Sequence, residues 1–493
     1  MSEPALPSST RVAIVGSGFS GLGLAIALQR KGIDHVVLER RGDLGGTWRD
    51  NSYPGCKCDV PSHLYSYSFA LNPNWSHTYS SQPEIFDYLR DCAAHFGVTP
   101  KIHFNTEVTG AQWDDKAKHW AIETSNGPLT ADVLVAANGG LAEPAQPDFP
   151  GIDSFEGAVF HSANWNSSHE LRGRPVAVIG TGATAVQIVP SIQPEVEHLT
   201  LFQRTPGWVL PHTDRPTTRF ERALYRRVPA LQKLVRHSIY WAREMLVFGM
   251  TKDQRFLKPI RKIATAHLHK QVKDPELRAK LTPRFSPGCK RLLLSNDYYR
   301  SLTAPNADVV TEPIDQISPG GIITADGIKH EVDTIVMATG FRVTDNPAHG
   351  RIKDHKGRSL LEAGKEGGFQ AYKGTSIAGF PNLFVLTGPN TGIGHTSLLV
   401  MVEAQIPYIV DALSFMEDKG AAAIEVRADR QQRFNKNLQK RMKRTVWNAG
   451  GCSSWYLDDK GRNVTMWPDF TWKYKLMMRR FDPDAYRIER KSV

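Results

Sequence analysis

Two glycine-rich turns have the residue types and spacing that could bind a dinucleotide. The first, Gly16-x-Gly18-x-x-Gly21, follows an apolar β-branched run at residues 11–15 and opens a stretch of helix-forming residues. In such a strand–turn–helix unit the first glycine permits the tight turn and the second lets the backbone approach a pyrophosphate. The third lets helix and strand pack closely, and the phosphates lie at the helix N-terminus. The predicted contacts are Gly16, Gly18, Phe19, Ser20 and Gly21.

The second turn, Gly180-x-Gly182-x-x-Ala185, differs from the first in the residue that ends the next strand. In the first unit this residue is Glu39, placed where a carboxylate accepts hydrogen bonds from a ribose diol. In the second unit it is Arg204, and a guanidinium binds a 2′-phosphate that a carboxylate would repel. The second site is therefore predicted to take NADPH rather than NADH. Its predicted contacts are Gly180, Thr181, Gly182, Ala183, Thr184, Arg204 and Thr205.

The elements around the two turns predict an α/β fold with two Rossmann-like dinucleotide-binding domains and a helical insertion in the second domain. A segment with three prolines, ending at Gly151, separates the two turns, and we place the first domain boundary there. The predicted segments are 1–145 and 345–493 for the first domain, 146–212 and 286–344 for the second, and 213–285 for the insertion.

The stretch between the two turns has a pattern of its own, made by Phe155, Gly157, His161 and Trp165. It resembles the F-x-G-x-x-x-H-x-x-x-W fingerprint of type I Baeyer–Villiger monooxygenases, flavoproteins that use NADPH to insert an oxygen atom beside a ketone carbonyl. Asn166 departs from the Pro or Asp that usually follows in the family. The resemblance covers nearly the whole chain. It implies that the first domain binds FAD and the second binds NADP.

Residues 45–59 are similar to a longer fingerprint of the same family, G-G-x-W-x-x-x-x-Y-P-G-x-x-x-D. In the family this loop runs along the flavin. The resemblance implies that Trp48 and Tyr65 flank the flavin and its ribityl chain, and that Asp59 lies beside the flavin ring. The predicted FAD contacts beyond the first turn are Glu39, Thr47, Trp48, Asp59, Tyr65, Val108 and Asn390.

The predicted catalytic residues are Arg291, Asp59, His161 and Trp165. The resemblance implies a cycle in which reduced FAD takes up O₂ at its C4a atom and the peroxide anion attacks the ketone, giving an ester or lactone. Arg291 would supply the fixed positive charge that this anion needs, and Asp59 would hold Arg291 in place. Lys290 would contact the 2′-phosphate of NADPH. We expect His161 and Trp165 to couple domain movement rather than transfer protons, with a purely structural histidine as the alternative.

Two other enzyme classes have to be weighed. A flavin-containing monooxygenase that oxidises soft nitrogen or sulfur has Tyr or Phe in place of Trp165 and lacks the Asp59 and Arg291 pair. An NAD(P)H:disulfide or quinone reductase inserts no oxygen, and a disulfide reductase needs a C-x₄-C pair, whereas this chain has Cys56-x-Cys58. We therefore expect a ketone and O₂ as substrates, with sulfoxidation as a second activity left open.

Composition bounds the class of protein. The chain has 493 residues, 41% hydrophobic and 23% charged, as in soluble multidomain proteins. Its N-terminus is polar, and no apolar run reaches the ~18 residues of a membrane span. Five cysteines predict free thiols in a reducing compartment, and Cys56-x-Cys58 has no second pair with which to bind a metal. We expect a cytoplasmic monomer or dimer without metal or stable membrane insertion.

The net charge of +11 is concentrated between residues 215 and 284, where 18 Lys and Arg stand against 5 Asp and Glu. No nucleic-acid-binding motif accompanies this basic stretch, so nucleic acid is not an expected partner. Its apolar residues follow helical spacing, and its charge would attract the phosphates of NADPH. We expect the apolar run at 239–248 to pack in the core, the alternative being a surface that touches lipid.

Overall fold

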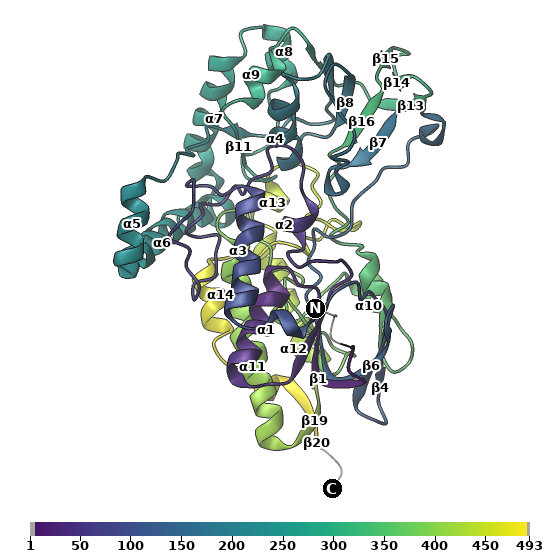
Figure 1. Ribbon diagram of the computed structural model, residues 1–493, viewed down its shortest axis with the longest axis vertical. Helices are drawn as coiled ribbons and strands as arrows, with labels where there is room; N and C mark the ends of the chain where they lie inside the picture. Colours follow the sequence, from purple (N-terminus) through teal and green to yellow (C-terminus); the bar gives the residue numbers. More distant parts are fainter. Residues whose placement is uncertain (1–4, 491–493) are drawn as a thin grey trace.

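Two α/β domains make up the structure, a computed structural model that describes residues 5–490. In Figure 1 the domain with the first glycine turn lies below, together with both ends of the chain, and the domain with the second turn lies above. The chain crosses between the two domains in two segments, and these segments lie side by side. Ala145 donates its backbone N–H to the carbonyl of Gly340 (2.8 Å), and Arg342 donates its own to the carbonyl of Glu143 (2.8 Å).

The lower domain is built on a sheet of eight strands in the order β17-β4-β5-β6-β1-β2-β3, with β18 also paired to β6. The first glycine unit lies at its centre, where Ile14 pairs in parallel with Val37 and Val135. All three side chains are fully buried, which explains why these strands read as continuous apolar runs. The strands are β1 Ser9–Val15, β2 His35–Leu38, β3 Ile102–His103, β4 Val108–Asp114, β5 His119–Thr124, β6 Gly127–Ala136, β17 Ile352–Lys353 and β18 Leu383–Val385.

Helix α11 is the longest helix of this domain and packs against α1. It is long and apolar enough to cross a membrane, but 61% of its most apolar window is buried inside the protein, so it is a core helix. A two-stranded antiparallel sheet of β19 (Ala421–Val426) and β20 (Tyr486–Arg490) closes the lower end of the domain. The helices are α1 Phe19–Lys31, α2 Thr47–Asp50, α3 Gln82–His95, α10 Leu360–Gly367, α11 Leu398–Lys419, α12 Ala428–Met442, α13 Val446–Ala449 and α14 Thr471–Met477.

The upper domain repeats the same construction in a parallel sheet of five strands in the order β12-β9-β8-β16-β7. The second glycine turn joins β8 to α4. A small antiparallel sheet of β13, β14 and β15 covers one side. The strands are β7 Ala158–His161, β8 Pro175–Ile179, β9 His198–Phe202, β12 Ala307–Val310, β13 Ile314–Ser318, β14 Gly321–Thr324, β15 Lys329–Glu331 and β16 Thr334–Met337; the helices are α4 Ala183–Ile192 and α9 Tyr298–Leu302.

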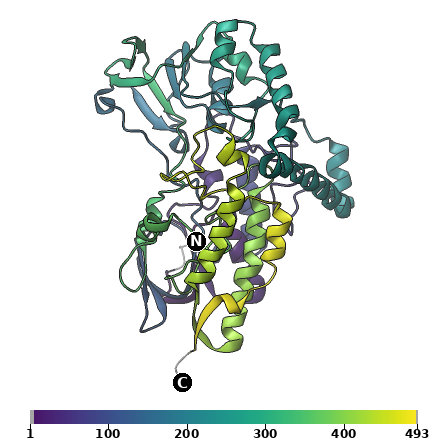
Figure 2. The same ribbon diagram turned by 180° about the vertical axis from the view of Figure 1, so that it is seen from behind.

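The basic stretch forms helices, and part of it projects from the body of the protein. Helices α5 and α6 extend to one side in Figure 1 and to the other in the reversed view of Figure 2. We call residues 219–257 the helical arm. The elements of the stretch are α5 Arg219–Arg227, α6 Pro229–Glu244, a π-turn Phe248–Lys252, a 3₁₀ turn Gln254–Leu257, α7 Lys258–Gln271 and α8 Pro275–Lys280.

One prediction about the arm is correct only in part, since Tyr240 and Val247 are buried as expected. The apolar run at 239–248 was expected to pack in the core, but Trp241, Met245 and Phe248 are exposed. The helical period is as expected; what differs is the direction in which the helix faces. Gln232, Arg236 and Glu244 of α6 turn toward the protein together with Tyr240, and part of its apolar residues therefore turn outward.

Candidate functional site

The packing of the protein itself requires two of the three glycines in the first turn, but not the remaining one. Gly16 has φ of 101°, and a Cβ there would lie 2.9 Å from the carbonyl oxygen of Ala137. At Gly21 a Cβ would lie 1.9 Å from the carbonyl oxygen of Gly16, so strand and helix can approach only because this residue is glycine. At Gly18 the nearest atom to an added Cβ is 3.7 Å away, an ordinary contact. The protein itself therefore does not require glycine at position 18, which agrees with a role of Gly18 in the approach of a pyrophosphate.

Glu39 is held ready at the end of β2. It is buried, and one carboxylate oxygen accepts hydrogen bonds from the backbone N–H (3.0 Å) and the hydroxyl (2.6 Å) of Ser17. The other oxygen accepts from the N–H of Arg41 (3.0 Å) and lies 3.3 Å from a guanidinium nitrogen of Arg49. The carboxylate is thereby fixed at the tip of the strand, beside the turn. This position agrees with its predicted role at a ribose.

The second turn is more open. A Cβ at Gly180 would lie 2.3 Å from the carbonyl oxygen of Ala338, whereas one at Gly182 would meet no atom of residues 5–490 within 4 Å. Thr181 and Thr205 lie together, since the Thr181 hydroxyl donates to the carbonyl of Thr205 (2.7 Å). The open space at Gly182 fits a second pyrophosphate.

Arg204 and Lys290 come together from segments far apart in the sequence. Burial, followed by the charge of Arg204, lowers the pKa of Lys290. Neither cation forms an ion pair with any residue of the described range 5–490. Two close and unpaired cations favour an anion between them. Their placement agrees with the predicted 2′-phosphate site.

The loop at residues 45–59 links the two domains. On one side the indole N–H of Trp48 donates to the hydroxyl of Tyr65 (2.9 Å), and the two rings pack edge to face. On the other side the hydroxyl of Tyr53 donates to Gln187 on α4 (3.0 Å), whose amide donates to the carbonyl of Lys57 (2.9 Å). Gln187 was not predicted, because a polar residue in the middle of an apolar helix does not indicate which distant group it contacts.

Asp59 and Arg291 form the ion pair that the resemblance implied, across 232 positions of the chain. Two guanidinium nitrogens face the two carboxylate oxygens, Nη2 to Oδ1 at 2.6 Å and Nε to Oδ2. Burial alone would raise the pKa of Asp59, but the charge of Arg291 and its hydrogen bonds outweigh this effect and hold the pKa below its usual value. The charge of Asp59 in turn raises the pKa of Arg291. Both groups therefore stay charged.

The Asp59–Arg291 pair faces open space. The two side chains expose 22% and 37% of their surface, so the pair lies at the wall of the site rather than in the core. Arg243 of α6 adds a second cation, with Nη2 3.5 Å from the backbone oxygen of Asp59 and 3.4 Å from the hydroxyl of Tyr79. Tyr456 is buried beside Arg291, and burial raises its pKa to about 12. The segment 451–456, which ends at Tyr456, resembles one that recurs in the family, whereas Arg243 carried no signal in the sequence, because only the fold brings it here.

His161 and Trp165 follow each other closely in the chain but have different surroundings. His161 ends β7, and its Nδ1 accepts a hydrogen bond from the N–H of Ala163 (3.1 Å) while its ring packs edge to face with Phe341. Burial lowers the pKa of His161, which favours the neutral ring. Trp165 packs edge to face against Phe160 inside the upper domain. The structure therefore brings His161, but not Trp165, against the second connection between the domains.

The two remaining predicted contacts differ in setting. Val108 opens β4, two residues after Thr106, whose N–H donates to the carbonyl of Glu39 (2.8 Å). Asn390 is buried with φ of 57°, and its amide donates to the carbonyls of Asn463 (2.8 Å) and Met466 (3.0 Å). Its side chain thus holds the C-terminal segment in place.

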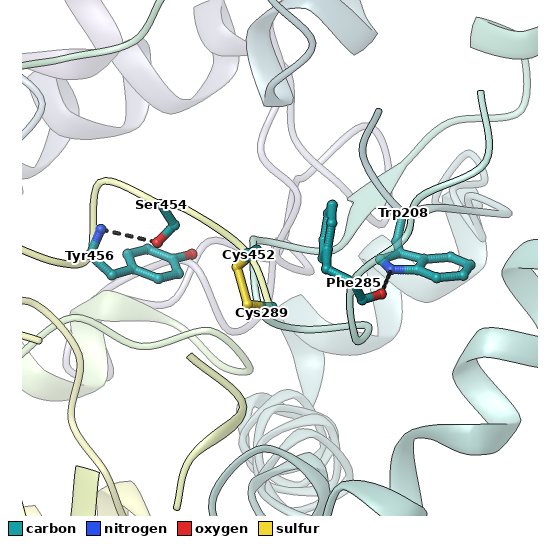
Figure 3. The surroundings of a disulfide bond; sticks show 6 residues. All are labelled: Trp208, Phe285, Cys289, Cys452, Ser454 and Tyr456. Atoms are coloured by element: carbon teal, nitrogen blue, oxygen red, sulfur yellow. Dashed lines mark hydrogen bonds between the residues drawn. A yellow bond between two sulfur atoms is a disulfide. The ribbon is translucent and has the colours of Figure 1, made fainter. Parts of the chain in front are cut away.

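The cysteines require a correction. Cys289 and Cys452 form a disulfide with a Cα–Cα distance of 6.1 Å, whereas free thiols were predicted throughout. Among the described residues Cys56, Cys58 and Cys92 are free, as predicted. The disulfide joins the segment that leads into Arg291 to the loop that carries Ser454 and Tyr456 (Figure 3). Counting cysteines could not reveal a pair separated by 163 residues.

The geometry defines a class of protein: a flavoprotein with two dinucleotide sites and an Arg–Asp pair between them. Residues 13–220 match the family described as pyridine nucleotide-disulphide oxidoreductase. A Baeyer–Villiger monooxygenase of Streptomyces coelicolor is 50% identical over 482 residues, covering 97% of this chain and 93% of the relative. The chain belongs to the Baeyer–Villiger monooxygenase family.

Solved structures agree with this assignment. Cyclohexanone monooxygenase from Rhodococcus sp. Phi1 bound to NADP+ superposes with a TM-score of 0.86 at 27% identity, covering 98% of this chain and 100% of the other. The OTEMO complex with FAD and NADP gives a TM-score of 0.87 at 26% identity, covering 97% of this chain and 99% of the other. The prediction of two dinucleotide-binding domains is confirmed.

Proposed function

We propose that this enzyme uses NADPH and O₂ to convert ketones to esters or lactones, with FAD bound in the lower domain and NADPH in the upper. The observation that carries the proposal is the Asp59–Arg291 pair, whose two side chains are charged and partly exposed. FAD supplies the hydride acceptor and the oxygen-activating chemistry. The residues of the chain then have to bind, orient and stabilise charge.

Arg291 is the residue to which we assign charge stabilisation. Attack on a ketone carbonyl builds negative charge on oxygen, and a guanidinium that is always protonated can stabilise it with several donors. Asp59 orients Arg291 through two hydrogen bonds and leaves the rest of the guanidinium free to face the site. Arg243 approaches Asp59 only through its backbone oxygen, so we assign it a positioning role.

Arg204 and Lys290 are proposed to hold the 2′-phosphate of NADPH, because they offer two adjacent positive charges without an internal carboxylate partner in residues 5–490. His161 is assigned a coupling role, since its ring packs on Phe341 in the second connection and its lowered pKa disfavours proton transfer from an imidazolium. The remaining predicted contacts to FAD and NADPH are carried forward as part of the same proposal.

A disulfide reductase is the less favoured alternative. Such an enzyme needs a reactive dithiol beside the flavin, and reactive thiols have a lowered pKa. Burial raises the pKa of Cys56 to about 12, and it also raises that of Cys58. These two thiols therefore stay protonated near neutral pH, which disfavours thiol exchange.

The test is product analysis under ¹⁸O₂. The purified yellow enzyme is mixed with NADPH and a panel of cyclic, linear, aromatic and steroidal ketones, together with sulfides, and the products are analysed by mass spectrometry. We expect one ¹⁸O atom in an ester or lactone from at least one ketone. Oxygen incorporation into sulfides alone would support an N- or S-oxygenating enzyme instead, and NADPH oxidation without any labelled product would support a reductase.

Three finer assignments belong to the proposal. We infer a cytoplasmic location and a monomeric or dimeric state. We infer that the chain enters the upper domain near residue 146 and leaves it near residue 344, because the two connections pair there. We infer that 213–285 is an insertion in the upper domain.

A further inference from the structure

The inner face of helix α6 is polar. Gln232, Arg236, Tyr240 and Glu244 recur every fourth residue, and all four are buried. Residues at this spacing lie on one side of a helix. A helix on the surface of a soluble protein normally buries its apolar residues most deeply, whereas the apolar residues beside this face of α6 are only half-buried.

Hydrogen bonds explain why the polar face is turned inward. Gln232 donates to the carbonyl of Asn72 (2.7 Å), and Arg236 donates to the carbonyl of His63 (2.8 Å). Glu244 accepts from the hydroxyl of Thr471 (2.5 Å). These polar groups are satisfied only in this orientation, and buried polar groups without partners are costly. The helix is therefore anchored on the body of the protein by its polar face.

The outer face of α6 and of the turn that follows is apolar. Leu234, Trp241, Met245 and Phe248 lie seven, four and three residues apart, a spacing that places them on one side of a helix. Their exposed fractions are 61%, 53%, 61% and 39%. Phe256 is 66% exposed, with its ring 6.5 Å from that of Phe248. We call these five residues the apolar stripe.

Exposed basic side chains lie along the apolar stripe in the sequence. Lys233 precedes Leu234, and Lys258 and Lys262 follow Phe256. None of these three lysines forms an ion pair with a residue in the range 5–490. Exposed Trp, Leu, Phe and Met side chains with unpaired lysines close in the sequence are typical of surfaces that lie in the interface of an anionic bilayer.

We propose that the helical arm docks on an anionic lipid bilayer, with the apolar stripe in the boundary between headgroups and acyl chains and the lysines on lipid phosphates. Charge favours lipid over a second copy of this chain, because the stretch 215–284 carries 18 basic and 5 acidic residues and would repel the same stretch of another copy.

Docking would place the enzyme's site close to the membrane. Arg243 lies two residues beyond Trp241 and reaches to within 3.5 Å of the backbone oxygen of Asp59. Trp241 of the docked face thus lies within one helical turn of Arg243, which is a neighbour of the Asp59–Arg291 pair. The site would then have access to apolar ketones dissolved in the bilayer. This consequence rests on the proposed function, whereas docking itself does not.

The test is co-sedimentation of the FAD-containing enzyme with vesicles of phosphatidylcholine and phosphatidylglycerol in a 3:1 ratio at 0.15 M salt. We expect the wild type to bind these vesicles, to bind pure phosphatidylcholine far more weakly, and to be released at 1 M salt, where the Debye length falls to about 3 Å. Trp241→Gln with Met245→Gln should lower the partition coefficient at least about tenfold. Each lysine removed, as in Lys258→Gln, should lower it about fivefold.

Ile328→Gln is the matched control, because Ile328 is 54% exposed between β14 and β15, on the side of the molecule away from the arm (Figure 1). It should bind vesicles like the wild type. Retained yellow colour and an unchanged melting temperature show that each variant is folded. The proposal is overturned if the wild type does not bind, if the Trp241 and Met245 variant binds equally well, or if neutral vesicles bind as strongly. A dimer in ultracentrifugation that the same variant abolishes would assign the stripe to a second copy and overturn it too.

Discussion

The two glycine turns share a sequence pattern, yet the protein has built far more of the first site than of the second. At the first, Glu39 is 5% exposed and accepts hydrogen bonds from Ser17 and Arg41. At the second, Arg204 is exposed, and it and Lys290 lack an ion-pair partner among residues 5–490. One site holds its acceptor rigidly, and the other presents two charges that repel each other until an anion arrives.

This difference predicts that the chain binds two similar dinucleotides in different ways. A preorganised acceptor loses little freedom when the ligand binds, which favours tight and lasting binding. Two unpaired cations gain most of their stabilisation from the ligand's own charge, which favours selection by phosphate and a dependence on salt. We therefore expect FAD to stay bound through purification and NADPH to be discriminated from NADH.

The largest expected effect comes from a pair of alanine substitutions. Gly18 (φ −71°) and Gly182 (φ −81°) have backbone angles that alanine adopts, and neither Cβ would clash with the described protein atoms. Gly18→Ala should therefore fold but lose FAD, colour and all oxygenation. Gly182→Ala should stay yellow with a raised KM for NADPH. Absorbance at 450 nm and steady-state kinetics check both, and the same phenotype in the two variants would contradict a division of labour between the turns.

Arg291→Ala should lower ketone oxygenation about 10²–10³-fold, because it removes one preorganised electrostatic contact. NADPH oxidation should continue and release hydrogen peroxide, since hydride transfer does not need this charge. Arg291→Lys should also be poor, because an ammonium cannot reproduce the two-pronged contact with Asp59. The measurement is ester formed per NADPH consumed.

Arg300→Ala is the matched control for Arg291, since Arg300 is an exposed arginine of the upper domain on α9. It should change neither rate. Ester formation near the wild-type rate in Arg291→Ala would remove Arg291 from the mechanism.

Arg204→Ala should raise the KM for NADPH by roughly 10- to 150-fold and leave that for NADH nearly unchanged, because a charge-assisted phosphate contact contributes about 1.5–3 kcal/mol. The effect should shrink as salt rises. Equal losses with both coenzymes would show that Arg204 does not bind the 2′-phosphate. They would contradict the electrostatic difference between the two turns.

The smallest effect on catalysis is expected from the disulfide. Cys452→Ser removes the covalent tie between the Arg291 segment and the loop of Tyr456, and typically such a tie contributes about 2–4 kcal/mol to stability. The melting temperature should fall, and ester yield per NADPH should drop a few-fold as the wall loosens. Cys92→Ser, which changes a free thiol, is the control. An unchanged melting temperature would indicate that Cys289 and Cys452 are not joined in solution.

Local patterns were enough for part of the fold. The strand that holds Ile14 was predicted from its apolar β-branched run, because such a run reflects burial on both faces of a strand. The glycine turns were predicted from their spacing between a strand and a helix, because a dinucleotide-binding turn needs glycines at these positions. Arg204 was singled out by its place after β9, at the position that Glu39 occupies after β2.

The sequence by itself thus determined the two nucleotide units and the charge that distinguishes them, since these depend on neighbours within about 25 residues. Only the tertiary structure decided which distant groups meet. The Asp59–Arg291 pair, which the sequence suggested only through family resemblance, spans 232 positions, and the Cys289–Cys452 disulfide spans 163. It also decided which way α6 faces: its apolar period was visible in the sequence, but the buried partners of Arg236 and Glu244, which turn that period outward, are supplied by residues far along the chain.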